Sequence, residues 1–498
     1  MNGLISIKLM KPSKLLQGIL LAILLLLPVQ LVAAELQLAS LFKDHSVLQR
    51  EAEVPIWGWA DPNEEISVEF AGQRVTGRAN AEGKWVVKLK PMKANAAPQE
   101  LVVQSKLTNK TLKLTDVLIG DVWLCTGQSN MVVPVRNAAN GDVEAQAAKY
   151  PQIRFFHVAT ASAETPQTLC GGEWSTCTPV TARNFCAVGY FFGRELHTKL
   201  NVPIGLVQSS LGSTAAESWT SQASMKKSKE FKSLADAKVE VEKQPGDRDN
   251  KAAVDKSLPG GLYNGMIAPL APYAVRGAIW YQGENNARDM VRAEAYRRLL
   301  PTMVNGWRED FGQEFPFYIV QLAGFAKRGD SPASDPWRVS VWSVLRESQA
   351  IAATTLPKSG LAVAIDIGEA QQIHPKNKQD VGRRLALVAL AKEYGQKREY
   401  SGPVFSAVKF EGPTAVVSFT HADGLAAKVG GAVTGFVIAG DDGVFQPAEA
   451  TIEGNTLRVS SPKVSKPIAV RYAWAAYPDC NLVNAAGLPA VPFRYPMK

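Results

Sequence analysis

Short apolar and polar runs alternate through the first part of the chain, over residues 35–115. The clearest runs lie at 54–59, 66–70 and 84–89. Turn residues separate them, as at Asp61-Pro62-Asn63. Because successive side chains of a strand point to opposite faces of a sheet, this spacing predicts a small antiparallel β-sandwich.

From about residue 116 the pattern changes, and continuous apolar runs alternate with apolar residues at helical spacing. The predicted strands lie at 117–124, 204–207, 278–281, 317–322 and 361–365, and the predicted helices at 185–200, 292–311, 338–353 and 378–394. Strand–helix alternation is typical of a parallel sheet with helices on both faces, so residues 116–400 are predicted to form an α/β core. Ligands in such folds bind at the carboxyl ends of the strands.

Two more segments stand apart from this core. Residues 222–258 are rich in Lys, Glu, Asp and Ala with few large apolar residues, which predicts an exposed helical insertion. Strand-like runs return over residues 401–498, for example at 415–419 and 456–459, and predict a second β region.

Residues 1–34 have the layout of a secretory signal peptide. Three lysines are followed by an apolar stretch at 15–27 and by small residues at 32–34. This segment predicts export, to the periplasm or outside the cell. A retained membrane anchor is the disfavoured alternative, because the apolar stretch is short and is broken by Pro28.

Composition narrows the class of protein further. At 498 residues the chain is too long for a single core. The formal net charge of +9 falls to +6 without the three leader lysines, and the remaining excess is spread along the chain, so no nucleic-acid partner is expected. Oligomeric state stays open.

The five cysteines bear on disulfides and metals. They are Cys125, Cys170, Cys177, Cys186 and Cys480. In an exported chain the spacing of Cys170 and Cys177 suggests one short disulfide, whereas Cys125 fits a buried strand. No Cys-x-x-Cys pair and no histidines at helical ligand spacing occur, so neither a metal nor another cofactor is expected.

The segment GQSNM at residues 127–131 directly follows the apolar run 122–125. It places Ser129 at the end of a predicted buried strand, where an α/β enzyme presents its nucleophile. Gly127 lets the chain turn sharply there. The general α/β-hydrolase elbow also has a glycine two residues after the serine, and Met131 occupies that position, which disfavours that fold.

Two later segments supply partners for Ser129. His374 is the strongest candidate base among five histidines, because it lies in a loop between a predicted strand and a predicted helix. The segment WYQGENN at 280–286 ends another strand and offers Gln282 and Glu284. Gly212 follows the strand at 204–207 and is a candidate oxyanion donor, with an ordinary strand–helix turn as the alternative.

These motifs resemble the carbohydrate-esterase branch of the SGNH hydrolases, which holds the sialate O-acetylesterases and related acetylxylan esterases. The segments that carry the resemblance are GQSNM, YNGMIAPL at 263–270, WYQGE at 280–284 and IHPKNK at 373–378, with VLQR at 47–50, VPIWG at 54–58, GLPA at 487–490 and PFR at 492–494. The resemblance implies a flavodoxin-like three-layer SGNH hydrolase core, with flanking β-sandwich-type regions at both ends. It also implies metal-independent removal of O-acetyl groups from sugars.

Carried over to this sequence, the resemblance makes Ser129 the nucleophile and His374 the base. The amides of Ser129 and Gly212 and the side chain of Gln282 would form the oxyanion hole. Relatives usually carry an aspartate shortly before the histidine, whereas here the corresponding positions are Gln371 and Gln372.

The acid that orients the imidazole is therefore open. Glu284 is the first candidate, Asp366 and Glu369 are weaker candidates, and a Ser–His dyad without an acid is a further possibility.

The expected function is that of an exported serine esterase acting on O-acetylated sialic acid. An acetylxylan or other polysaccharide esterase is the alternative within enzymes, and a non-catalytic carbohydrate-binding protein is the alternative from another class. Sialate would favour an arginine placed for its carboxylate, and Arg136, Arg276 and Arg288 lie near motif segments. Trp123, Trp219 and Trp280 are expected in the core rather than as sugar platforms.

Overall fold

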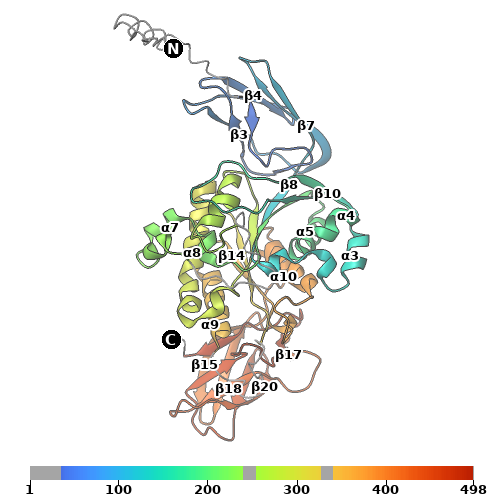
Figure 1. Cartoon of the computed structure of the whole chain (residues 1–498). Coiled ribbons are helices and arrows are strands. Elements are labelled where there is room, and N and C mark those ends of the chain that lie inside the picture. Colours follow the sequence, from blue (N-terminus) through green and yellow to red (C-terminus); the bar gives the residue numbers. More distant parts are fainter. Residues whose placement is uncertain (1–34, 239–253, 327–339, 497–498) are drawn as a thin grey trace, which may run out of the picture.

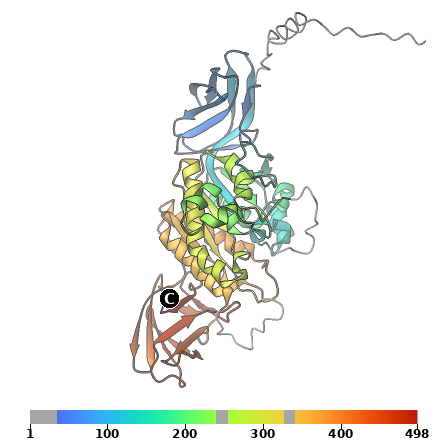
Figure 2. The same ribbon diagram turned by 60° about the vertical axis from the view of Figure 1, so that its left-hand side comes forward.

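The computed structural model describes residues 35–238, 254–326 and 340–496. An N-terminal β region, an α/β core and a C-terminal β region follow one another along an elongated molecule (Figures 1 and 2). The predicted signal peptide and residues 239–253 of the predicted insertion lie outside the described residues. Within those three ranges no helix combines the length and the apolar character that crossing a membrane requires.

The N-terminal β region consists of two antiparallel layers, as predicted. One layer holds β1 (Gln37–Leu38), β3 (Val54–Trp59) and β6 (Lys84–Leu89). The other holds β4 (Glu65–Phe70), β5 (Gln73–Arg78), β7 (Asn95–Ser105) and the first half of β8 (Thr111–Gly127), with β2 (Val47–Gln49) beside β8. Alternate residues of β6 are buried, as the alternation of apolar and polar residues in its sequence predicts.

The central sheet has the order β10-β9-β11-β8-β12-β13-β14. The strands after β8 are β9 (Tyr150–His157), β10 (Trp174–Cys177), β11 (Ile204–Ser210), β12 (Gly277–Tyr281), β13 (Phe317–Gln321) and β14 (Ser359–Val363). The five strands from β11 to β14 are parallel and follow the chain order 2-1-3-4-5 of the flavodoxin-like fold. Parallel β9 and antiparallel β10 extend the sheet beyond β11.

Long helices cover both faces of this sheet (Figure 1). They are α5 (Ala187–Leu200), α8 (Met290–Phe311), α9 (Val341–Thr355) and α10 (Lys378–Lys392). Neighbouring residues of β13 show the two faces, since Phe317 meets Trp307 of α8 at 6.0 Å between ring centroids. Tyr318 stacks instead on Trp123, which meets Phe192 of α5 edge-on. The predicted three-layer α/β core is confirmed.

Short helices connect these elements. They are α2 (Ser129–Val132), α3 (Gly141–Ala147), α4 (Pro179–Asn184), α6 (Ala216–Trp219) and α7 (Gln222–Lys227). Helix α7 and a 3-10 segment at Lys232–Asp236 form the described start of the predicted insertion. The three tryptophans expected in the core, Trp123, Trp219 and Trp280, are fully buried.

The C-terminal β region is built from two antiparallel four-stranded sheets. The first has the order β15-β16-β21-β20 and contains β15 (Val404–Glu411), β16 (Thr414–Thr420), β20 (Glu449–Glu453) and β21 (Thr456–Ser460). The second has the order β19-β18-β22-β24 and contains β18 (Phe436–Ala439), β19 (Gln446–Pro447), β22 (Ala469–Tyr472) and β24 (Phe493–Tyr495). A two-stranded ribbon joins β17 (Ala426–Ala427) to β23 (Leu482–Val483). A separate apolar cluster fills this region, which confirms the predicted second β region.

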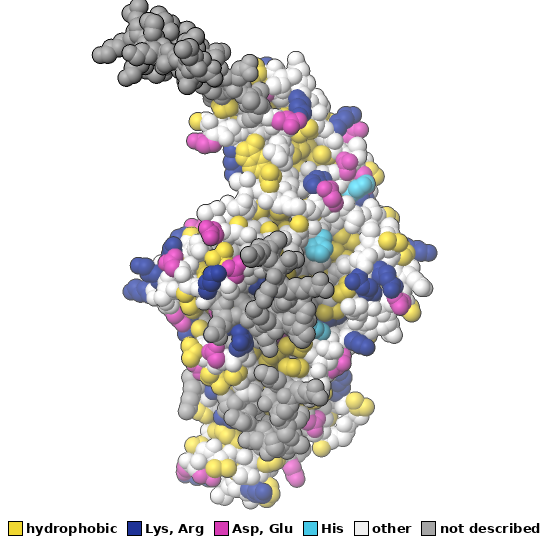
Figure 3. Space-filling view, in the orientation of Figure 1, with side chains coloured by type: hydrophobic (Ala, Val, Ile, Leu, Met, Phe, Trp, Pro, Cys, Tyr) yellow, Lys and Arg dark blue, Asp and Glu magenta, His cyan; other side chains and the backbone are white. Residues whose placement is uncertain are grey.

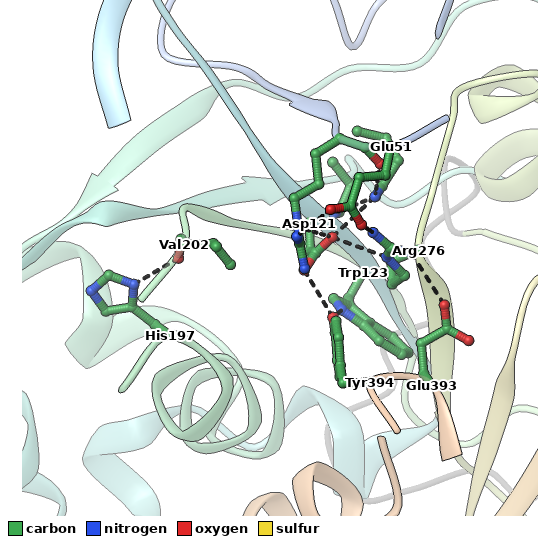
Figure 4. Close-up of polar contacts among 11 residues, drawn as sticks. Glu51, Asp121, Trp123, His197, Val202, Arg276, Glu393 and Tyr394 are labelled. Carbon is green, nitrogen blue, oxygen red and sulfur yellow. Dashed lines mark hydrogen bonds and ion pairs between the residues drawn. The ribbon is translucent and has the colours of Figure 1, made fainter. Parts of the chain in front are cut away.

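Strand β8 runs through the expected boundary at residues 115/116. Its first half pairs antiparallel with β7, and its last seven residues pair in parallel with β11. Where β8 enters the core, the fully buried Asp121 accepts five hydrogen bonds of 3.0 Å from Gln49, Arg50 (two), Arg276 and Tyr394 (Figure 4). This buried carboxylate therefore joins the N-terminal β region to two parts of the core.

All five cysteines are free thiols, so the disulfide expected between Cys170 and Cys177 does not occur. The two side chains have different surroundings. Cys170 lies beside Ser40 and Lys43, whereas Cys177 lies beside Tyr150 and Arg194. Cys125 is fully buried in β8, as expected.

Candidate active site

Ser129 lies where β8 ends and α2 begins. Gly127 has a φ of +131°, and a Cβ on it would lie 2.2 Å from the carbonyl oxygen of Tyr281, so only glycine fits there. The neighbouring strands hold this turn, since Gln128 N–H donates to Tyr281 O at 2.9 Å and Leu211 N–H donates to Gly127 O at 3.1 Å. The Ser129 hydroxyl oxygen is buried and has no hydrogen-bond partner among the described residues.

Gly212 lies directly beside Ser129, because a Cβ on Gly212 would be 3.5 Å from Ser129 Cβ. Ser129 is the first residue of α2, so its amide has no acceptor within the helix. Neither of these two amides donates a hydrogen bond to another described residue. The main-chain N–H groups of Ser129 and Gly212 are therefore both free to donate to an oxyanion, as an oxyanion hole requires.

The side-chain amide of Gln282, the third expected donor, already makes hydrogen bonds within the protein. Its side-chain nitrogen donates to Thr214 O at 3.0 Å and to Asn286 Oδ1 at 2.8 Å, and its oxygen accepts from Tyr296 Oη at 2.9 Å. A fully buried amide has to satisfy its own polar atoms, and here both hydrogens are used. In this arrangement Gln282 holds the loop after Gly212 and presents no free N–H to a substrate.

His374 lies in the loop between a 3-10 turn at Ile365–Ile367 and helix α10, as expected. Its Nε2 is buried and has no hydrogen-bond partner in the described part of the chain. Burial lowers the pKa of His374, and the positive charge of Lys378 lowers it further. The imidazole is therefore neutral at pH 7, which is the state a general base requires.

None of the three candidate acids forms a hydrogen bond or ion pair with His374 within the described ranges. Asp366 is bound by Arg384, at 2.6 and 2.9 Å, and by Lys428 at 2.9 Å. Burial alone would raise the pKa of Asp366, but these cations hold it below its usual value. The Glu369 carboxylate accepts from the main-chain N–H of Lys376 at 2.8 Å.

Glu284 reaches the histidine loop through one intermediary. Its Oε1 accepts from Asn130 Nδ2 at 2.5 Å, and the same nitrogen donates to the carbonyl oxygen of Ile373 at 2.9 Å. Ile373 immediately precedes His374, and Asn130 immediately follows Ser129. The 2.9 Å bond therefore brings the serine and histidine segments together. Burial raises the pKa of Glu284, against the opposing effects of Asn130 and Lys378.

Two site residues, Asn130 and Lys378, were not predicted. Lys378 is fully buried, donates from Nζ to Asn130 Oδ1, and lies 5.3 Å from the ring centroid of Tyr281. Burial lowers the pKa of Lys378 to about 7, against the opposing charges of Glu284 and Glu369. Both residues stand inside motif segments, but motif spacing contains no signal that the two segments meet.

The three arginines near motif segments have different positions. Arg276 binds Asp121 at the amino end of β12, which is the opposite edge of the sheet from Ser129. Arg136 donates to Asn184. Arg288 is exposed in the loop after β12 and has no hydrogen bond or ion pair with any described residue.

Charged side chains of both signs are interspersed on the face of the molecule that Figure 3 shows.

Among the described residues no group of three or more His, Cys, Asp or Glu side chains could hold a metal ion. The absence of a cofactor nevertheless remains a prediction.

Comparison with known proteins assigns the family. Residues 119–391, which include every candidate site residue, match the family described as "Carbohydrate esterase, sialic acid-specific acetylesterase". Sialate O-acetylesterases of Rattus norvegicus and Homo sapiens are each 30% identical to this chain over 91% of its length, and the match covers 93% and 91% of those proteins. A carbohydrate acetylesterase of Xanthomonas citri is 42% identical, with a TM-score of 0.83 over 93% of this chain and 100% of that one. The chain thus belongs to the sialic acid-specific acetylesterase family of carbohydrate esterases and is a carboxylic ester hydrolase that acts on O-acetylated carbohydrates.

Proposed function

We propose that the protein is an exported serine esterase that removes O-acetyl groups from sialic acid, with Ser129 as nucleophile and His374 as base. The observation that supports this most strongly is the bond from Asn130 to Ile373 O. It joins the residue after Ser129 to the residue before His374, and within the described residues Ser129 Oγ and His374 Nε2 do not yet hydrogen-bond to each other.

The chemistry follows from these positions. Ser129 Oγ attacks the acetyl carbonyl carbon while His374 Nε2 takes its proton, and the amides of Ser129 and Gly212 donate to the oxyanion. The intermediate collapses as His374 returns the proton to the departing sugar oxygen, which leaves an acetyl-enzyme. His374 then takes a proton from water, the hydroxide attacks the acetyl carbon, and acetate leaves as Ser129 regains its proton.

Arg288 supports sialate as the substrate. Sialic acid carries a carboxylate, which arginine binds through charge-assisted hydrogen bonds. Arg276 is committed to Asp121, whereas Arg288 is exposed and unpaired within the described residues, four residues beyond Glu284 in the same loop. The acetylated xylose unit of xylan itself has no carboxylate and would not need this arginine.

Acetate release by the mature protein tests the proposal. Wild type and Ser129→Ala would be compared on a chromogenic acetyl ester, an O-acetylated sialic acid and acetylated xylan. We expect turnover by wild type, fastest on the sialic acid, and complete loss in Ser129→Ala. Activity retained in Ser129→Ala would overturn the serine mechanism, and preference for xylan would overturn only the substrate. Absence of wild-type turnover on all three would favour the non-catalytic alternative.

Arg288→Gln separates the two sugar classes directly. Loss of a charge-assisted hydrogen bond worth about 1.5–3 kcal/mol predicts a KM for O-acetylated sialic acid raised by about tenfold or more. The KM for the chromogenic ester and for xylan should not change. Arg136→Gln, which removes another exposed arginine, is the control.

Export is tested by the amino terminus of protein recovered from the periplasm or medium. A start at Glu35 is expected from the small residues at 32–34. A start at Met1 on membrane-bound protein would favour the retained anchor.

A further inference from the structure

Asn130 contacts three segments of the site at once. Its Nδ2 donates to Glu284 in the loop after β12 and to Ile373 in the histidine loop, and its Oδ1 accepts from Lys378 in α10. Asn130, Glu284 and Lys378 are 2%, 6% and 0% exposed, respectively. Hydrogen bonds in such a buried setting are costly to break, because water does not replace the lost partner.

We propose that Asn130 and Lys378 are positioning residues of the esterase, with Lys378 fixing the side-chain amide of Asn130 and Asn130 holding Glu284 and the His374 loop against Ser129. This inference rests on the proposed function, since it concerns the same serine and histidine.

The donor and acceptor inventory supports this role. An asparagine amide offers an oxygen on one side and an NH2 group on the other, whereas a lysine ammonium, the form of Lys378 below its pKa of about 7, only donates. Lys378 therefore requires the oxygen of Asn130 on its side, which directs the NH2 group to Glu284 and Ile373. If the amide rotated by half a turn, its oxygen would face the Glu284 carboxylate and the Ile373 carbonyl, and the serine and histidine segments would lose their link.

The charges around His374 give this arrangement a signature that a purely structural contact lacks. Lys378 of α10 is the charged group that acts on His374, and Glu284 of the β12 loop and Glu369 of the histidine loop act in turn on Lys378. An aspartate beside the imidazole would raise the pKa of the histidine, whereas the positive charge of Lys378 lowers it. Removing Lys378 should consequently raise the pH at which the base becomes active.

Lys378→Met tests the inference, with Lys392→Met as a matched control. Lys392 is a second lysine of α10, exposed where Lys378 is buried, which donates to Ser359 O at 2.9 Å and lies 5.6 Å from the Tyr400 ring, at the far end of the helix. We expect Lys378→Met to lower kcat on the chromogenic ester by on the order of 10- to 100-fold, as misplaced catalytic groups do, with little change in KM. The acid limb of its kcat/KM profile should move to higher pH, and Lys392→Met should match wild type in both readouts.

A Lys378→Met enzyme with wild-type kcat and an unmoved acid limb would overturn the inference. Should that variant fail to fold by circular dichroism, Asn130→Asp decides the question, because it preserves the shape but sets a second carboxylate against Glu284. Asn130→Asp should lower kcat with KM retained, and wild-type kcat would overturn the inference. Ser129→Ala in the same assay reports separately on the proposed nucleophile.

Discussion

At the scale of single residues, several polar atoms of the site segments are buried without a hydrogen-bond partner among the described residues. Buried hydroxyls, carboxylates and ring nitrogens normally have hydrogen-bond partners, because burial without one costs free energy. Five such atoms without a partner among the described residues belong to the site segments: Ser129 Oγ, Tyr281 Oη, Glu284 Oε2, Asn285 Oδ1 and His374 Nε2. They lie on the turn after β8, at the end of β12 and in the histidine loop, and ten other such atoms lie elsewhere in the described part of the chain, so this property alone does not locate the site.

The pH dependence of activity follows from His374. Burial and the charge of Lys378 lower the pKa of this imidazole, so it loses its proton at a lower pH than a free histidine does. In a profile of kcat/KM against pH, activity should rise through a midpoint below the ordinary value of about 6.5 and then stay high at neutral pH. A midpoint at or above that value would contradict the assignment of His374 as a buried base.

The sequence predicts Ser129 and His374 as site residues because Ser129 follows a recognisable strand and His374 precedes a recognisable helix, and their roles stay a prediction. It could not identify Asn130 or Lys378 as site residues, because their bonds join distant parts of the chain. Asn130 lies 154 residues before Glu284 and 248 residues before Lys378. It also could not show that Thr214 and Asn286 occupy the amide of Gln282. Contacts of this kind depend on how the strands are ordered in the sheet.

At the scale of elements, strand β8 explains a change of pattern that the sequence contains. Its residues alternate in exposure up to Asp116 and are all buried from Val117 onward. At this point the strand passes from the β-sandwich into the middle of the parallel sheet. The change of pattern in the sequence therefore reflects new surroundings of one continuous strand, although it resembles a domain boundary. The long helices were predictable because apolar residues recur in them at helical spacing; in the structure Asp289 also caps the start of α8 and Gly312 follows its end.

The turn between β8 and α2 predicts a large effect of Gly127→Ala. A Cβ would lie 2.2 Å from Tyr281 O at a φ of +131°, so the strand end and Ser129 have to shift. Thermal unfolding should show a much lower Tm than for Gly312→Ala, where φ is +65° and no atom lies within 4 Å. The control should lose only about 1–2 kcal/mol, the cost of a left-handed backbone. Equal losses in the two variants would contradict this account of the turn.

At the scale of the whole molecule, buried charged groups tie both β regions to the core. Asp121 joins the N-terminal region to the strand and helix ends of the core (Figure 4). Arg346 of α9, which is fully buried, donates to the carbonyl oxygens of Leu322 and Ala323 after β13 and of Ala475 and Ala476 in the C-terminal region. The order of the three parts in Figure 1 is thus held by specific contacts on either side of the site.

Asp121→Asn should destabilise the protein strongly. The substitution removes the only fully buried negative partner of Arg50 and Arg276 and leaves them Glu51 and, for Arg276, Glu393; loss of one partner of a buried ion pair costs about 3–5 kcal/mol. Glu51→Gln, which removes a half-exposed partner of the same arginines, should cost no more than about 1 kcal/mol. Urea unfolding measures both, and similar losses would show that Asp121 does not have this role.

The central claim is that Ser129 is the nucleophile, and covalent labelling tests it most directly. A serine-directed fluorophosphonate would be added to the mature protein, and the modified residue would be located by peptide mass spectrometry. The account predicts one adduct per chain at Ser129, loss of esterase activity in proportion to labelling, and slower labelling of His374→Ala. An adduct on a different serine, or full turnover by enzyme labelled at Ser129, would contradict it.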